Sequence, residues 1–236
     1  MNPGDNHHAQ ARFIKAMQPL PEDAATPLRL CRACVTGLPI ERSGISVHSD
    51  EFGLEFLSAS DAVAERLEWS QITLGQGPAV DAFNTGEPVV ALAPGEEADR
   101  WPLFVRELDD QSPESIWALP LQLGAVRVGV LDLYRSSPIP LTGREMSDAV
   151  QVAEVVTAML LAAGRSGRLV APLTEWWNQP LPTREVHQAT GMLVVQLGVG
   201  AREAYARLQA HAFASGRPLD AVAHDVVFRR LRFEAS

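Results

Sequence analysis

The sequence is poor in cysteine, has a single lysine and contains no long apolar run. Two cysteines cannot build a disulfide framework, which excludes the class of small secreted domains that depend on one. A transmembrane helix needs about eighteen or more consecutive apolar residues, and no such run occurs. The first residues, MNPGDNHHAQARFIK, also lack the apolar centre of a secretory signal. We therefore expect a cytoplasmic protein with no membrane-spanning segment.

Motifs that carry catalysis are missing as well. The chain has no G-x-S-x-G, no H-E-x-x-H and no phosphate-binding G-x-x-x-x-G-K-[ST]. Gly75-Gln-Gly77 shares only a G-x-G with the dinucleotide-binding motif, and these glycines are better explained by a turn. No nucleophile–base or acid–base set is visible. We therefore expect a protein that is not an enzyme and that needs no cofactor.

The composition is that of a folded chain with unevenly distributed charge. Of the 236 residues, 46% are hydrophobic and 21% are charged, a length that allows one large domain or two smaller ones. The net charge of −9 argues against nucleic-acid binding over the whole surface. Residues 180–236 nevertheless hold seven arginines and five acidic residues, a net +2, whereas residues 1–179 carry −11. Such asymmetry indicates different partners for the two segments.

Both cysteines lie in one C-x-x-C, Cys31 and Cys34, inside a predicted helix. The i,i+3 spacing places them on one helix face. A metal site needs two further ligands, and neither a second C-x-x-C nor a nearby histidine pair supplies them. We expect the two thiols to belong to the apolar core and predict no metal; a redox role stays open.

The first two thirds of the chain alternate between predicted strands and helices. After an N-terminal segment, 1–21, that we expect to be flexible, the helices are expected at 24–36, 62–69 (capped by Ser60), 78–85, 102–110 and 142–163 (capped by Thr142). Strands are expected at 44–48, 54–58, 88–92, 116–123 and 126–134, the last two joined as a hairpin across Gly124-Ala125. This order implies an α+β fold with a central antiparallel sheet flanked by helices.

Two segments narrow the fold further. With this order of elements, TLGQGPAVDAFNTGEPVV at 73–90 and VRVGVLDLY at 126–134 resemble the GAF sensor domain, over residues 22–164. The sequence lacks the Asn-Lys…Phe-x-x-x-Asp-Glu pattern of cyclic-nucleotide GAF domains, and it has no cysteine placed for a bilin. The resemblance therefore implies a sensor of an unknown small molecule or protein ligand.

The sequence predicts a boundary near residue 165. Pro172, Pro180 and Pro182 interrupt the segment that follows the long helix, because proline removes a backbone donor and restricts the residue before it. We expect a linker at 165–174. Trp176 and Trp177 are costly to leave in water, so we expect them to dock as a releasable clamp on a domain or on a dimer partner.

Three short amphipathic helices are predicted in the last fifty residues. Thr183 is expected to cap the first, at 184–197; the second spans 201–215, and Pro218 begins the third. Gln188-Ala-x-Gly191-Met-Leu, Ala204-Tyr205-x-x-Leu208 and Arg217-Pro-Leu219-x-x-Val222-Ala223 follow in order, and residues 175–236 resemble the ANTAR domain. That resemblance implies a small three-helix module that binds paired hairpin loops in nascent RNA and promotes transcription antitermination. Many members of the family carry lysine at the position of Thr190.

The candidate RNA contacts lie in this segment. Guanidinium groups pair with phosphates and stack on loop bases, and six of the seven arginines in this segment are candidates, among them Arg232. We predict RNA contacts at Gln188, Thr190, Arg202, Arg207, Arg217, Arg229 and Arg230. The alternative for each is an ordinary solvated arginine. Two alternative functions also stay open: a tail that only dimerises beside a GAF interaction or small-molecule sensor, and a helix-turn-helix that binds DNA.

The long helix before the linker predicts self-association. Its apolar stripe exceeds what a single small sheet has to cover, and a paired helix would hide the excess. The stripe comprises Val152, Val155, Val156, Met159 and Leu160. We therefore expect a homodimer, whose two tails contact two RNA loops.

Overall fold

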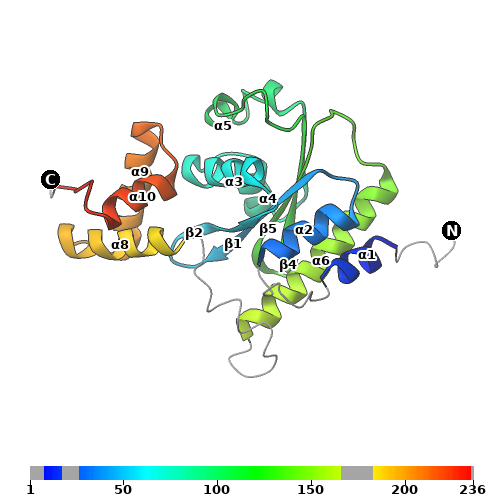
Figure 1. Ribbon diagram of the computed structural model, residues 1–236, viewed down its shortest axis with the longest axis horizontal. Coiled ribbons are helices and arrows are strands. Elements are labelled where there is room, and N and C mark those ends of the chain that lie inside the picture. The colour runs from blue at the N-terminus through cyan, green and yellow to red at the C-terminus, as the bar shows by residue number, and fades with distance from the viewer. Residues whose placement is uncertain (1–7, 18–26, 166–182, 235–236) are drawn as a thin grey trace.

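The computed structural model describes residues 8–17, 27–165 and 183–234. Figure 1 shows a central sheet with helices on both faces, and the helices of residues 184–227 clustered beside one end of the sheet. We call residues 8–165 the sheet domain and residues 183–234 the tail. The predicted α+β fold is confirmed. Within the described ranges, no helix is both long enough and apolar enough to cross a membrane.

The sheet contains β1 (Arg42–Ser49), β2 (Gly53–Ala59), β3 (Val89–Leu92), β4 (Ser115–Leu123) and β5 (Val126–Arg135). Its order is β2-β1-β5-β4-β3, and every neighbouring pair is antiparallel. The β4–β5 hairpin turns at Gly124-Ala125, as the sequence predicts. β1 and β5 approach closely at Gly129, where a Cβ atom would lie 2.0 Å from the Ser46 carbonyl oxygen. A residue with a side chain would therefore push these two strands apart.

One face of the sheet is covered by α1 (His8–Ala16), α2 (Pro27–Gly37) and α6 (Gly143–Arg165), as Figure 1 shows. The prediction that residues 1–21 are flexible is wrong for α1. Ala9 and Phe13, one helical turn apart, are buried in the core, and the Arg12 Nη2 donates to the Gly37 carbonyl over 2.7 Å. This single-turn apolar pair is too short a periodic signal to reveal a helix.

The predicted surplus of apolar surface on α6 is smaller than expected. Val152, Val156 and Leu160 are buried against the sheet and α1, and Val155 and Met159 are half-buried. The helix begins as predicted, with a capping box in which Thr142 Oγ1 accepts from the Glu145 amide and Glu145 accepts from the Thr142 amide. Helix α1, which the sequence did not predict, thus covers part of the apolar stripe of α6 that we expected a dimer partner to cover.

The other face carries α3 (Ala62–Leu74), α4 (Pro78–Thr85), the short 3-10 helix η1 (Pro94–Glu96) and α5 (Pro102–Arg106). Asp61, not Ser60, caps α3 by accepting from the Ala64 amide over 2.9 Å, and α3 continues past residue 69. The helix predicted at 102–110 ends early. Asp109 accepts from the Gln111 amide, and this local turn competes with further helix.

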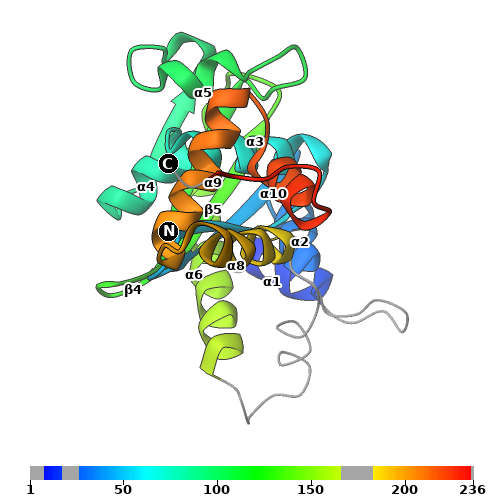
Figure 2. The same cartoon turned by 90° about the vertical axis from the view of Figure 1, so that its left-hand side faces the viewer.

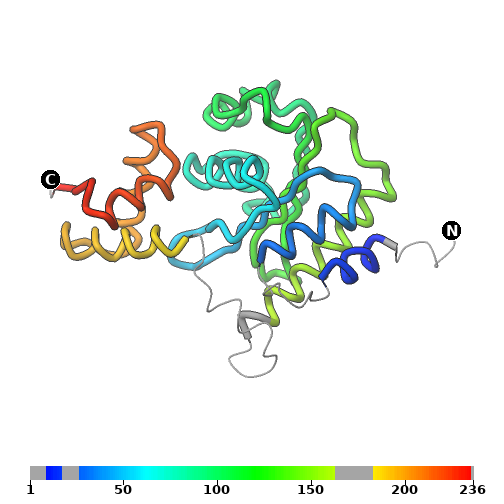
Figure 3. The backbone as a smooth tube through the Cα atoms, viewed as in Figure 1, coloured from blue at the N-terminus to red at the C-terminus, as the bar shows by residue number. Residues whose placement is uncertain are grey.

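The tail consists of α8 (Arg184–Leu197), α9 (Ala201–Ser215) and α10 (Leu219–Val227). Figure 3 follows the chain through these helices, and in Figure 2 the tail faces the viewer. Pro218 precedes α10 as predicted, but Thr183 makes no capping hydrogen bond with its side chain. The predicted linker at 165–174 and the proposed clamp residues Trp176 and Trp177 lie outside the described residues, apart from Arg165.

Candidate functional site

The tail encloses its own small apolar core. Each helix contributes side chains at three- and four-residue spacing that are essentially inaccessible to solvent. They are Val186, Ala189 and Leu193 from α8, Ala204, Leu208 and Ala212 from α9, and Leu219, Val222, Ala223 and Val226 from α10. This core fixes which faces of the three helices point outward; of the predicted contact residues, Arg202 and Arg207 lie on α9, and Arg229 and Arg230 follow α10.

A hollow of about 620 Å³ lies between the outward face of α8 and the chain that follows α10. We call it the tail hollow. It is lined by Gln188, Gly191, Met192, Val195, Gln196, Val226, Arg229, Leu231 and Arg232. Val195 is 85% exposed, which is unusual for an apolar side chain of this size. The hollow thus combines an exposed apolar surface, two amide side chains and two guanidinium groups.

Arg229 enters this hollow through an uncommon backbone conformation. Its φ angle is 59°, in the left-handed region that is unfavourable for residues with a Cβ atom. The turn is held by Asp225, whose carbonyl accepts from the amides of Arg230 at 2.7 Å and Leu231 at 3.1 Å. Strained residues of this kind are concentrated at functional sites. The side chains of Arg229 and Arg232 have no ion-pair or hydrogen-bond partner among the described residues, so their charges are available to a ligand.

The other predicted arginines do not line the tail hollow. Arg207 pairs with Glu203 at 2.7 Å, and Arg217 pairs with Asp225 at 2.7 Å. Arg230 lies over the ring of Phe228, its guanidinium carbon 5.7 Å from the ring centroid. Arg202 donates to the Asp50 carbonyl of the sheet domain over 2.9 Å. The predicted contacts are therefore not one continuous surface.

Of the two predicted contacts on α8, only Gln188 reaches the hollow. Thr190 is 2% exposed, and its hydroxyl donates to the Val186 carbonyl over 2.8 Å. It belongs to the tail core, which corrects the expectation of a surface contact at this residue. Sequence reasoning missed Met192, Val195 and Gln196. The helical spacing of these residues with Gln188 indicates that they share one side of α8. An apolar residue such as Val195 is normally predicted to be buried, so the spacing alone did not mark this side as a binding surface.

The tail packs against the sheet domain along a contact that we call the seam. Phe56, Trp69 and Ile72 of the sheet domain share one apolar cluster with the tail core. The ring of Phe52 lies 4.9 Å from that of Tyr205 and 5.2 Å from that of His187, measured between centroids. The seam is therefore largely apolar, unlike the polar contacts that are common between loosely associated domains.

Polar contacts at the seam fix its geometry. His187 Nε2 lies 2.7 Å from the Glu55 carboxylate on β2, and Gln209 Nε2 donates to the Ile72 carbonyl near the end of α3 over 2.7 Å. The hydrogen bond to Glu55 raises the pKa of His187 above its ordinary value, against the opposing effect of partial burial. The charge on His187 therefore favours the docked tail.

Beneath α3, the sheet domain contains a buried polar network. Tyr134 and Ser46 each donate to the Glu68 carboxylate over 2.7 Å, and Gln71 donates to Asp132 over 3.1 Å. Burial raises the pKa of both carboxyl groups, and the charge of Glu68 raises that of Asp132 further. We interpret the pair as sharing a proton.

The two cysteines are core residues. Both are 0% exposed, and the Cys31 thiol donates to the Ser58 carbonyl. Burial raises the pKa of the Cys31 thiol to about 12, which disfavours the reactive thiolate. Within the described part of the chain, no group of three or more His, Cys, Asp or Glu side chains could hold a metal ion.

Comparisons with known proteins agree with this architecture. The structure resembles the GAF domain of a phosphoenolpyruvate-protein phosphotransferase from Acinetobacter, with a TM-score of 0.53 and 10% identity, over 72% of this chain and 100% of that one. It also resembles the GAF domain of a phosphoenolpyruvate-protein phosphotransferase from Coxiella burnetii, with a TM-score of 0.53 and 14% identity, over 70% and 99% of the two chains. These likenesses show the fold alone. No curated protein matches the sequence.

Family models place both parts of the chain. The GAF domain model matches residues 17–163, and the ANTAR domain model matches residues 183–227. The GAF domain is a sensor domain, the ANTAR domain is an RNA-binding antitermination domain, and neither is catalytic. The chain therefore belongs to the GAF domain family, and its tail is an ANTAR domain.

Proposed function

We propose that this protein is a signal-responsive regulator that promotes antitermination by binding hairpin loops of nascent RNA in the tail hollow. Its GAF domain senses a ligand, and two copies of the chain act together on paired hairpins. The two free cysteines fit the reducing cytoplasm, where transcription takes place in bacteria.

One observation carries the proposal: the chemistry of the tail hollow matches that of a flipped-out RNA base and its flanking phosphates. Arg229 and Arg232 supply guanidinium groups for phosphates, and within the described part of the chain neither group is paired. The amide of Gln188 has a donor and an acceptor for the edge of a base, and Gln196, whose Nε2 donates to the Phe233 carbonyl, can accept through its amide oxygen. Val195 offers an exposed apolar surface against which a base can pack. Sequence-specific RNA recognition uses unstacked loop bases in this way.

The test is RNA affinity, measured by fluorescence anisotropy with a labelled two-hairpin RNA at several salt concentrations. We expect Arg229→Ala and Arg232→Ala each to weaken binding about tenfold, because each removes a charged hydrogen-bonding group. Each substitution should also reduce the slope of log affinity against log salt by about one, if the lost contact is to phosphate. Arg32→Ala, an exposed arginine on α2, is the matched control and should change neither quantity.

The same assay separates the tail hollow from the other predicted arginines. Arg207→Ala should have a small effect, since this side chain already pairs with Glu203. Unchanged affinity in folded Arg229→Ala and Arg232→Ala variants would contradict the proposal. It would leave dimerisation as the function of the tail. Preference for duplex DNA over hairpin RNA in competition would instead favour the helix-turn-helix alternative.

The dimer is supported by the residual apolar surface of α6, where Val150 is 38% exposed and Val155 and Met159 are half-buried. Two linked tails gain affinity for two hairpins through their high effective concentration. Light scattering of the protein alone and with the two-hairpin RNA measures the assembly directly. A monomer under both conditions would contradict this part of the proposal.

A further inference from the structure

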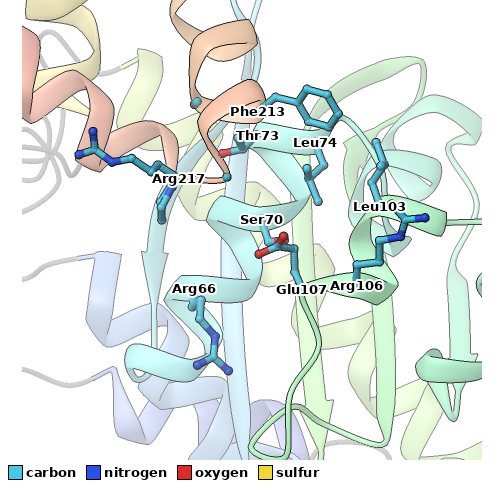
Figure 4. Close-up of a pocket in the computed structure, with 12 residues that line it drawn as sticks. Arg66, Ser70, Thr73, Leu74, Leu103, Arg106, Glu107, Phe213 and Arg217 are labelled. Carbon is cyan, nitrogen blue, oxygen red and sulfur yellow. The ribbon is translucent and has the colours of Figure 1, made fainter. Parts of the chain in front are cut away.

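A second cavity, of about 240 Å³, lies at the seam. We call it the seam cavity, and Figure 4 shows the residues around it. Residues of α3 and α5 form one wall, and the end of α9 with the turn into α10 forms the other. The lining comprises Arg66, Ser70, Thr73, Leu74, Leu103, Arg106 and Glu107 from the GAF domain, and Ala212, Phe213, Gly216, Arg217 and Pro218 from the ANTAR domain.

Two hydroxyl groups in this wall have no hydrogen-bond partner among the residues that the structure describes. Ser70 Oγ and Thr73 Oγ1 are buried and make no hydrogen bond to any described residue. Thr73 as a whole is 7% exposed. A threonine inside a helix usually donates to a carbonyl of the preceding turn, which this one does not do. Leaving a buried hydroxyl unpaired costs free energy. A polar group of a bound molecule would remove that cost.

The charged side chains around the seam cavity indicate which charge a bound polar group would carry. Arg66 pairs with Asp109 at 2.9 Å, and Arg217 pairs with Asp225 at 2.7 Å. Figure 4 shows both of these guanidinium groups, and that of Arg106, directed away from the centre, whereas the Glu107 carboxylate points toward Ser70. Among the charged side chains that line the cavity, Glu107 is therefore the one whose charged group is turned toward its centre in Figure 4. The ring of Phe213, 49% exposed, adds an aromatic face that also attracts cations.

The interior of the GAF domain offers less room. The space between α3 and the sheet holds the side chains of Glu68, Gln71, Asp132 and Tyr134. The fit is so close that a Cβ atom at Gly44 would lie 2.0 Å from the Glu68 Oε1 atom. A sensed molecule at that place would have to displace a hydrogen-bonded core.

We propose that the seam cavity is an effector site for a small molecule that joins an aromatic or aliphatic body to a protonated amine. The amine pairs with Glu107 and donates to the hydroxyls of Ser70 and Thr73. The apolar body packs between Leu103 and Phe213. The regulatory meaning of the site rests on the proposed function. Because both domains line the cavity, a bound molecule favours the docked tail by its preference for that arrangement.

The test uses the full chain and three probes of one shape: 3-phenylpropylamine, the neutral 3-phenylpropanol and the anionic 3-phenylpropionate. Calorimetry should show the amine binding about tenfold more tightly than the alcohol, and the acid more weakly than both, because only the amine forms a charged hydrogen bond with the carboxylate. Glu107→Gln should abolish the preference for the amine. Glu96→Gln, an exposed glutamate in η1, is the matched control and should preserve it.

The two walls are tested separately. Leu103→Ala on α5 and Phe213→Ala on α9 should each weaken binding of the amine and of the alcohol severalfold. An effect of only one of them would overturn the assignment to the seam, and equal binding of all three probes would overturn the assignment of an amine. Failure to bind the amine would also overturn the assignment of an amine. None of these measurements includes RNA, so they stand or fall separately from the proposed RNA binding.

Discussion

Glu68 and Asp132 are enclosed between α3 and the sheet, where two negative charges cannot be accommodated together. The Asp132 Oδ1 atom has no hydrogen-bond partner among the described residues, as expected if a proton there completes the pair. A folded state that keeps a proton which the unfolded chain releases is progressively destabilised as the pH rises. The raised pKa of Asp132 thus makes this residue a source of pH-dependent instability.

Asp132→Asn should remove that instability, because the amide supplies the missing donor without titrating. Above the ordinary carboxyl pKa of about 4, the free energy of unfolding of the wild type should fall as the pH rises. The fall should be at most about 1.4 kcal/mol per pH unit and should stop once the pH passes the raised pKa of the folded state. The variant should show a smaller slope and greater stability at neutral pH. Urea unfolding at pH 5 and pH 7.5 measures both.

Asp99→Asn is the control for this substitution, since Asp99 is an exposed carboxyl group in a loop. It should leave the slope unchanged. Equal slopes in the Asp132 variant and in the wild type would show that the pair carries no shared proton.

Among the elements, α1 is the helix that the sequence did not predict and that contributes to the core of the GAF domain. It buries Phe13 completely and covers part of α6 that was expected to face a second copy of the chain. Arg12 joins it to α2 at the Gly37 carbonyl, where a cation is favoured by the helix dipole. The helix is thus an integral part of the GAF core, not an appendage.

Phe13→Ala should lower the free energy of unfolding by about 3 kcal/mol, since truncation of a buried phenylalanine removes apolar contacts and leaves a cavity. The neighbouring Ile14 is 52% exposed, so Ile14→Ala should cost less than about 1 kcal/mol. Urea denaturation of both variants makes the comparison. Similar losses from the two substitutions would mean that α1 does not pack as described.

Elements with strong local signals were predictable from the sequence. The β4–β5 hairpin turns at the predicted glycine, and the three tail helices begin and end near the predicted glycines and proline. The failures have local causes: α1 offers only two apolar residues per face, and the turn at Asp109 ends α5 early. The tail hollow was predictable only in part, because long-range contacts decide which arginines are already paired. Nothing in the sequence separates Arg217, held by Asp225, from Arg229.

At the scale of the whole molecule, the ion pair between His187 and Glu55 links the position of the tail to proton binding. The pKa of His187 is raised in the docked arrangement by Glu55, with a further contribution from Glu51. A group whose pKa is raised by an interaction stabilises that interaction fully below its ordinary pKa. The stabilisation is lost as the pH rises through the raised value. Docking should therefore be stronger at pH 5.5 than at pH 8.

His187→Gln should flatten this pH dependence, because glutamine keeps a donor but cannot gain a charge. Small-angle X-ray scattering at the two pH values measures the change as a larger radius of gyration of the wild type at high pH. His224→Gln removes a histidine–glutamate pair within the tail, with Glu185, and serves as the control. A radius that is independent of pH in the wild type would refute the link.

The seam also has a consequence for the behaviour of the protein at high concentration. β2 is the outermost strand of the sheet, and its Leu54 and Phe56 side chains are covered by the tail cluster. An uncovered outer strand with apolar side chains is a template on which other chains add as further strands. The docked tail therefore also keeps these apolar side chains of the outer strand away from other chains. Any signal that releases the tail from the sheet domain exposes these side chains of β2. The protein with a released tail should therefore stay monodisperse only at low concentration or for a short time.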